Sequence, residues 1–371
     1  MAQSAIQNFV LEFLKPGKMR NSEAGIPDSF FQNLAKSSEP TVEKWKAALD
    51  YSRRIHAVAP FLTQLICSEQ FQTLPQSIQN EFESALRQER MRLALLDHIL
   101  DETLAIFQDQ KIPTILLKGM DLGRRFYPER ILRPMTDVDL LVPKSQYQKS
   151  IDCLIQAGFQ IIGEQTKNRF RIELSKTPGG PAVELHYFLQ EGDTPSGIEE
   201  IWKRAQNVPL SGLESFTNSS FNPRTLDPND FLFYLIRHAG YQHLLESPGW
   251  LNDLHFLIQS PEFQTQGNWE TLLKSLQKTQ TQSAGYFILR FLNDFWDTPI
   301  PQEIFASLGR EISPWKQALL RKRASPEKCF PIQGRRLKWV VSSRLLLRDT
   351  PWTAFQYGLG VVKRHGLSQF K

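Results

Sequence analysis

The sequence predicts an α+β protein in which a small mixed sheet is flanked by an N-terminal helical region and a C-terminal helical bundle. Apolar residues recur at helical spacing before residue 110, and helical spacing returns beyond about residue 196. Between these regions lie short apolar runs rich in β-branched residues and bounded by Gly and Pro, a pattern typical of strands. With 371 residues, the chain is long enough for two or three domains.

The N-terminal region reads as helical up to the first strand. The clearest stretch is residues 84–107, where seven apolar side chains can share one broad helix face. They are Leu86, Leu93, Leu96, Ile99, Leu100, Leu104 and Phe107. Residues 1–18 lack a basic segment ahead of their apolar part, so we expect a short amphipathic helix there and no signal peptide.

The central region predicts alternating strands and helices. Ile112–Leu117 is an apolar run expected to form a buried strand, followed by a Gly turn and a short helix. The remaining elements, in order, are a strand over 137–142 ended by Pro143, a helix over 145–159 with Gly158 near its end, and strands over 170–174 and 182–189.

The C-terminal region predicts helices again. The first has a clear start: Asp227 can cap it, Pro228 suits its first turn and Asp230 follows. Further helices are expected over 249–260, 268–297 and 302–322, with shorter basic segments over 335–348 and 351–363. The predicted domains are a helical region 1–108, a catalytic α/β core 109–195, a helical domain 196–325 and a basic amphipathic tail 326–371.

Two carboxylates on the second predicted strand are the first candidates for chemistry. Side chains at i and i+2 of a strand point to the same face, so Asp137 and Asp139 would project together while Val138 packs beneath. Two like charges held that close are tolerable when they share a divalent cation, and hard oxygen ligands suit Mg²⁺. Two solvated acidic residues on an exposed strand face would give the same sequence pattern.

Flanking residues strengthen the metal interpretation. Lys118 and Gly119 end the preceding strand, and a glycine there lets backbone approach a phosphate ahead of a helix N-terminus. Glu184 lies on a later apolar strand and shares its face with His186. A third carboxylate suits two-metal phosphoryl transfer, either as a ligand or as a base. A plain edge-strand acid is the alternative for Glu184, and a packed histidine for His186.

The stretch Ile115–Val142 resembles the nucleotidyltransferases of the DNA polymerase β superfamily, and more narrowly an uncharacterised bacterial nucleotidyltransferase family. The resemblance rests on an LKG motif at 117–119, Tyr-Pro at 127–128, RPMTD at 133–137, DVDLLV at 137–142 and ELH at 184–186. A weaker resemblance further along the chain places His238, Trp250 and Asp253 at positions that match the family. Met120 stands where the broader superfamily usually has Ser.

The resemblance implies the polymerase β-like topology and a Mg²⁺-dependent enzyme with a two-metal site. It would transfer a nucleoside monophosphate from an NTP, with ATP the expected nucleotide, to an acceptor hydroxyl and release pyrophosphate. Asp137, Asp139 and Glu184 would be the catalytic, metal-binding carboxylates. Lys118, Gly119, Arg133 and His238 would bind the nucleotide. The acceptor stays open among a small molecule, sugar, peptide and protein. The alternative is a degenerate relative that binds nucleotide or a partner without turnover.

Charge is unevenly distributed along the chain. The formal net charge is +5, yet residues 314–371 hold 13 basic and 2 acidic residues, a net +11 against −6 for the rest. Trp339, Trp352, Phe355 and Tyr357 are interleaved with these basic residues. A solvated basic helix face would give this pattern. Of the functional interpretations, a membrane surface or an acidic partner is favoured over nucleic acid by the apolar share.

Three distant cysteines, Cys67, Cys153 and Cys329, form no zinc or disulfide pattern. Their spacing is typical of reduced thiols.

No run approaches about 18 apolar residues, so no membrane-spanning helix is expected. The predicted location is therefore cytoplasmic, with peripheral membrane attachment through the tail as the variant.

Overall fold

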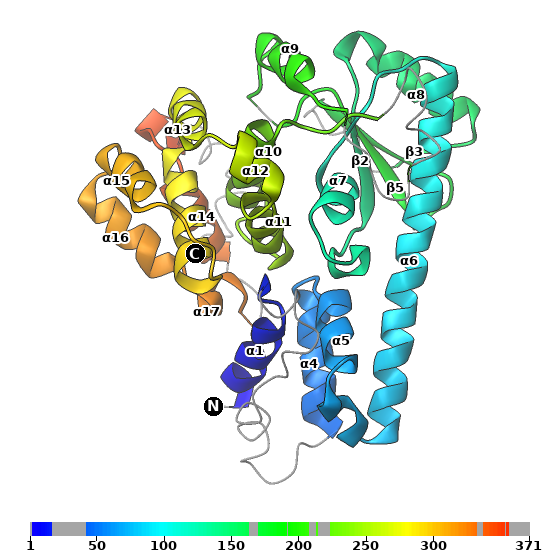
Figure 1. Cartoon of the computed structure of the whole chain (residues 1–371), viewed down its shortest axis with the longest axis vertical. Coiled ribbons are helices and arrows are strands. Elements are labelled where there is room, and N and C mark those ends of the chain that lie inside the picture. The colour runs from blue at the N-terminus through cyan, green and yellow to red at the C-terminus, as the bar shows by residue number, and fades with distance from the viewer. Residues whose placement is uncertain are drawn as a thin grey trace. The chain divides into compact units, whose positions relative to one another are not determined.

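A computed structural model confirms the predicted α+β class (Figure 1). Helices precede and follow a five-stranded mixed sheet. The residues described are 2–16, 42–162, 170–190, 192–207, 213, 223–331, 337–352 and 354–355. Tyr357 lies outside them.

The chain divides into two compact units that are discontinuous in sequence. One comprises Met1–Ala57, Cys67–Ile78 and Leu232–Lys371, and the other Val58–Ile66 and Gln79–Phe231. We call them the helical unit and the sheet unit. The four-part domain division drawn from the sequence stays a prediction.

The sheet unit holds all five strands in the order β1-β2-β5-β4-β3. The strands are β1 (Ile115–Leu116), β2 (Asp137–Leu141), β3 (Gln160–Ile162), β4 (Arg171–Ser175) and β5 (Ala182–His186). β2 and β5 are parallel, and the other neighbours are antiparallel. The two strands predicted to carry acidic residues are therefore direct neighbours near the centre of the sheet.

Helices accompany the sheet within this unit. They are α5 (Val58–Ile66), most of α6 (Gln76–Asp109), α7 (Lys118–Arg125), the short η2 (Arg130–Leu132), α8 (Tyr147–Gln156) and α9 (Pro195–Arg204). Alternation along the strands divides the sheet into two faces. Val138, Leu140, Val183 and Leu185 pack with apolar residues of α6 and α8 in one buried cluster. The residues between them in sequence point to the opposite, polar face.

Several strands differ from the expectation. β1 covers only two residues of the predicted 112–117, because Pro113 cannot donate to a ladder and the strand's far edge bridges to Arg224 instead. β3 was not predicted, since three residues carry too little pattern to be recognised. Gly158 adopts φ +91° just after α8, as the predicted C-terminal position requires.

The helical unit contains the N-terminal helices and most of the C-terminal ones. Its helices are α1 (Ala2–Phe13), α4 (Val42–Arg54), α11 (Gly249–Ile258), α12 (Pro261–Gln266), α13 (Trp269–Lys278), α14 (Gln282–Phe295), α15 (Gln302–Arg310), α16 (Pro314–Arg323), α17 (Pro326–Cys329) and α18 (Leu337–Leu346). α10 (Pro228–Arg237) contributes residues to both units. Its predicted cap is present, with the backbone N–H of Asn229 donating to Asp227 at 2.9 Å.

Two predicted helices are each divided in two. The segment 268–297 breaks between α13 and α14, where Gln280 adopts φ +54°. The segment 302–322 breaks before Pro314, which starts α16 in the first-turn position that suits proline. Apolar periodicity continued across the second break and concealed it, whereas the first break lies in a polar stretch, residues 277–283, that the prediction of one helix passed over. Among the described residues, no helix combines the length and apolar character needed to cross a bilayer.

Candidate functional site

The sheet places Asp139 and Glu184 side by side on its polar face. They are register partners on the parallel strands β2 and β5, so their side chains leave adjacent backbones in the same direction. Both are nearly fully buried, with 4% and 3% of their surface exposed. Asp137 lies two residues earlier on β2 and is partly exposed. The sequence predicted a shared face for the β2 pair, and the sheet order adds Glu184 to it.

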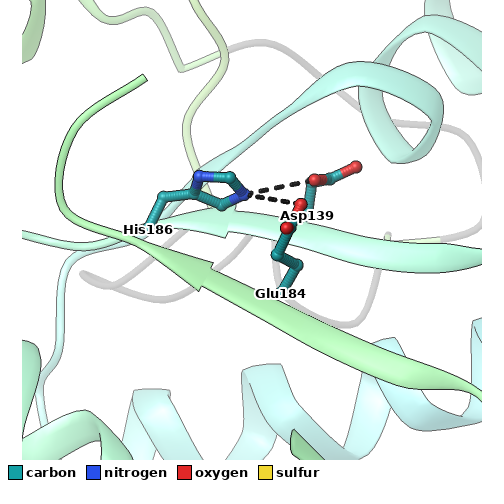
Figure 2. Close-up of side chains that lie close together, drawn as sticks. All are labelled: Asp139, Glu184 and His186. Carbon is teal, nitrogen blue, oxygen red and sulfur yellow. Dashed lines mark hydrogen bonds and ion pairs between the residues drawn. The ribbon is translucent and has the colours of Figure 1, made fainter. Parts of the chain in front are cut away.

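His186 completes a compact cluster with these carboxylates. Its Nε2 lies 3.2 Å from Asp139 Oδ1 and 3.0 Å from Glu184 Oε2. Figure 2 shows the imidazole directed at both carboxylates, with Glu184 and His186 rising from the same strand. One ligand atom from each of the three residues lies within 4.8 Å of the others. His186 is 1% exposed, so the cluster is shielded from bulk water on this side.

Lys118 reaches into the same cluster from the start of α7. Its Nζ donates to Asp139 Oδ1 at 2.6 Å and to Glu184 Oε2 at 3.4 Å. The residue has φ +44°, a left-handed conformation that costs a side-chain-bearing residue about 1–3 kcal/mol. Strain of this kind persists only where the surroundings enforce it, and here it accompanies a buried ammonium held between two carboxylates.

Arg171 on β4 is a site residue that the sequence reasoning missed. Its guanidinium forms an ion pair with Glu184 Oε1 at the exposed rim of the cluster. Arg171 pairs with His186 in the antiparallel ladder of β4 and β5. The signal was present in the alternation of the 170–174 strand, which puts Arg171 and Glu173 on one face. Only the strand order reveals which face that is.

The cations set the ionisation of the cluster. Burial would raise the pKa of Glu184, but the hydrogen bond and charge of His186, together with Lys118, outweigh it and hold that pKa well below its usual range. Burial likewise opposes charge on His186, yet its hydrogen bonds to Asp139 and Glu184 raise its pKa above the ordinary value. Without metal, His186 and Lys118 are therefore the partners that favour the charged form of Glu184.

Asp137 behaves differently from its neighbours. Burial first, and then the negative charge of Asp139, raise its pKa to about 7, and Lys118 only partly offsets these effects. Negative charges on carboxylates held this close repel one another. A divalent cation bound among the carboxylates would relieve this repulsion.

Gly119 and Arg133 form the wall beside α7. A Cβ on Gly119 would lie 2.5 Å from Met135 Cγ and 2.6 Å from its Sδ, so any larger residue requires the Met135 side chain to shift. The group that Gly119 approaches closely is thus a protein side chain, that of Met135. Arg133 is 8% exposed, and its Nη1 donates to the carbonyl oxygen of Pro134.

The other arginines of this region pair with acids of the sheet unit outside the cluster. Arg124 and Arg130 share the carboxylate of Asp97 on α6. Arg125 pairs with Asp121, one turn earlier on α7, at 3.0 Å. These contacts give the three arginines structural partners.

His238 belongs to the helical unit, whereas the carboxylates belong to the sheet unit. It lies in a turn of π-helix over His238–Gln242 and is 1% exposed. Its ring packs edge-on against Trp250, with centroids 4.7 Å apart, and lies 4.6 Å from the ring of His243. The predicted nucleotide contact at His238 stays a prediction.

The donor set fits a divalent cation. Two adjacent buried carboxylates, with a third beside them, offer the hard oxygens that Mg²⁺ prefers. Because Nε2 of His186 already donates to both carboxylates, the imidazole is placed to orient them. The cation at the site in the metal-free protein is Lys118.

Comparisons with known proteins bear on the family. No protein of curated function matches the sequence. One matching solved structure is the solution structure of the antibiotic-resistance factor ANT(2'')-Ia, at 12% identity and a TM-score of 0.36, covering 51% of this chain and 93% of that one. Likeness at that level says nothing about this chain's substrate. The profile described as "uncharacterised nucleotidyltransferase" matches residues 41–297, which confirms the predicted family and enzyme class. The chain belongs to this uncharacterised nucleotidyltransferase family.

Proposed function

We propose that the protein transfers a nucleoside monophosphate from an NTP to an acceptor hydroxyl in a Mg²⁺-dependent reaction that releases pyrophosphate. The observation that carries the proposal is the register pairing of Asp139 with Glu184 on parallel strands, with Asp137 two residues away. Buried carboxylates in such a group need a cation, and family membership makes a nucleotide the expected partner of that cation.

Asp137, Asp139 and Glu184 would hold the metal. Bound Mg²⁺ supplies Lewis acidity at the phosphates and lowers the pKa of the attacking hydroxyl. His186 holds Asp139 and Glu184 at a fixed separation through its shared hydrogen bonds. In the reaction, the acceptor oxygen bonds to the α-phosphorus, the bond from that phosphorus to the bridging oxygen breaks, and pyrophosphate leaves with the electron pair.

Glu184 suits the role of ligand better than that of base. It contacts the basic side chains of Lys118, Arg171 and His186. A carboxylate whose pKa is held down by such partners is a poor proton acceptor. The acceptor proton would therefore leave to solvent or substrate phosphate, and Glu184 would stabilise the metal and the imidazolium.

The nucleotide would be held by basic residues beside the carboxylates. Lys118 is placed to exchange its contact with Asp139 for one with a phosphate once a metal neutralises that carboxylate. Arg133 lies buried next to Gly119 at the start of α7. His238 is proposed for the nucleotide on the family resemblance, with ATP as the expected nucleotide.

The direct test is turnover by an Asp139→Asn variant. Pyrophosphate release would be measured with each NTP, with and without Mg²⁺, across a panel of hydroxyl acceptors that includes sugars and the protein itself. Loss of a ligand that touches the metal should lower the rate by on the order of a hundredfold or more.

The matched control is Asp152→Asn, the same change at an exposed carboxylate on α8 in the same unit. It should retain wild-type turnover, and circular dichroism should show both variants folded. Full Mg²⁺-dependent activity in Asp139→Asn would refute the proposal.

A second candidate is a binding module without turnover. The observation that favours it is Lys118, whose ammonium sits 2.6 Å from Asp139 as the cation of the site. In this case a nucleotide would bind equally well with and without Mg²⁺, and no acceptor would support pyrophosphate release.

A further inference from the structure

The C-terminal part of the helical unit exposes large apolar side chains. Trp315 and Leu319 on α16 are 64% and 40% exposed, and Trp352 and Phe355, after α18, are 64% and 55% exposed. These are the only exposed tryptophan and phenylalanine side chains in the described part of the chain. We call these four residues the aromatic surface. Folded proteins seldom gather such residues on their surface without a partner.

The outer face of α16 is built by helical spacing. Trp315, Ala318, Leu319 and Lys322 stand at i, i+3, i+4 and i+7, and all are exposed. The inner face carries Lys316 and Leu320, which are buried. The inner face of α16 therefore packs in the core of the unit, and the apolar residues of the outer face do not.

The two halves of the aromatic surface are linked through Lys316. Its Nζ donates to the carbonyl oxygen of Arg348 at 2.6 Å. Lys316 directly follows Trp315 in the sequence, and Arg348 lies four residues before Trp352. Asp349 accepts from the backbone N–H groups of Gln282 and Ser283 at the start of α14. The rings of Trp352 and Phe355 stack with centroids 5.9 Å apart. The exposed rings thus project from an anchored part of the unit.

Positive charge surrounds these rings. Residues 314–355 contain ten basic and two acidic residues, a net charge of +8. Arg321, Lys322 and Lys328 are exposed. Exposed tryptophan with lysine and arginine is the composition that binds a lipid–water interface, where rings enter the headgroup layer and cations meet anionic lipids.

We infer that the aromatic surface docks onto an anionic lipid bilayer and holds the protein at a membrane face. A nucleic-acid site would combine basic residues with aromatic rings on which successive bases stack. Leu319 has no ring, and the rings of Trp352 and Phe355 stack on each other, so this surface lacks separate rings for successive bases. The inference concerns the helical unit alone and is independent of the transfer reaction.

The test is co-sedimentation of the full chain with vesicles of phosphatidylcholine alone and with added phosphatidylserine. The wild type should bind the anionic vesicles, and binding should weaken as salt rises. Trp315→Ser with Trp352→Ser should weaken binding at least about tenfold, because two interfacial rings are lost. Lys322→Ala should weaken it about fivefold.

Matched controls are available because each variant changes an exposed residue. Met91→Ser removes an apolar side chain that is 73% exposed on α6, and Lys278→Ala removes an exposed charge on α13. Both should bind as the wild type does. Failure to bind anionic vesicles, or equal loss in the controls, overturns the inference. Binding to RNA in place of vesicles, weakened by the same tryptophan changes, overturns it in favour of nucleic acid.

Discussion

Lys118 is the residue on which the state of the site depends. It is 7% exposed, has a left-handed backbone and places its ammonium between Asp139 and Glu184. A buried carboxylate pair without a cation is strongly destabilising, so this lysine stabilises the sheet unit while no metal is bound. A metal bound at this site would compete with the lysine for the same oxygens.

Lys118→Met keeps most of the side-chain volume and removes the charge. Without metal, we expect the free energy of unfolding to fall by about 3 kcal/mol, since two buried carboxylates lose a partner. Mg²⁺ should then stabilise the variant more than the wild type. Urea unfolding with EDTA or with Mg²⁺ measures both effects.

Lys203→Met is the control for that change. Lys203 pairs with Glu200 at 2.7 Å, but both side chains are exposed. Exposed pairs contribute less than about 1 kcal/mol. An equal loss of stability at Lys203 and Lys118, or no loss at Lys118, would contradict the role assigned to the buried ammonium.

Asp137 predicts a pH dependence of stability in the metal-free protein. Its folded-state pKa, about 7, lies above the ordinary 3.8. The unfolded chain therefore releases this proton first, and the wild type loses stability as pH rises from about 4 to about 7. Asp137→Asn abolishes that loss, so its stability advantage over the wild type should grow across this window.

Chemical unfolding in EDTA at several pH values checks this expectation. The advantage of Asp137→Asn should be smallest near pH 4 and largest at and above pH 7, on the order of 1 kcal/mol or more. A difference between the two proteins that does not vary with pH would show that Asp137 is not held near its charged neighbours.

At the scale of elements, α7 and the loop before β2 depend on Gly119. Gly119→Ala should lower the free energy of unfolding by about 1–3 kcal/mol, because its Cβ would clash with Met135. In a Met135→Ala background the same change should cost at least about 1 kcal/mol less. Thermal or urea unfolding of the four proteins in the cycle measures this coupling.

Gly123 provides the comparison within the same helix. A Cβ there would meet Arg133 Cβ at 3.6 Å, an ordinary contact. Gly123→Ala should therefore be neutral, or stabilising by up to about 1 kcal/mol through helix propensity. Equal destabilisation at both glycines would mean that the clash with Met135 is not the cause.

The strands show what a sequence can reveal about this site. Alternation predicted that Asp137 and Asp139 share a face and that Glu184 and His186 share another, because a strand's period is local. That the two faces are the same one depends on β2 pairing with β5, which is a non-local choice. The resemblance of the motifs supplied the grouping that spacing alone could not.

Other features had no readable signal. A lysine in a sequence gives no indication of a left-handed backbone such as φ +44°, so the direction of the Lys118 side chain could not be predicted. Arg171 approaches Glu184 only because β4 lies on the far side of β5. The two helix breaks did have local signs, Pro314 and the polar stretch 277–283, and the prediction of continuous helices passed over both.

At the scale of the whole chain, charge and chemistry are separated. The carboxylate cluster belongs to the sheet unit, and the basic segment that carries the aromatic surface belongs to the helical unit. The net +11 of residues 314–371 lies outside the unit that holds the carboxylates. The two proposed properties, nucleotide transfer and attachment to an anionic surface, should therefore respond independently to substitution.

The most direct test of the account is calorimetric titration of the full chain with each NTP, with and without Mg²⁺. The comparison is between the wild type, Asp137→Ala with Asp139→Ala, and the exposed control Asp152→Ala. We predict that one NTP binds the wild type and the control only with Mg²⁺, and that the double variant binds it on the order of a hundredfold more weakly. Binding that ignores both Mg²⁺ and the two carboxylates, or no NTP binding under any condition, would contradict the proposed site.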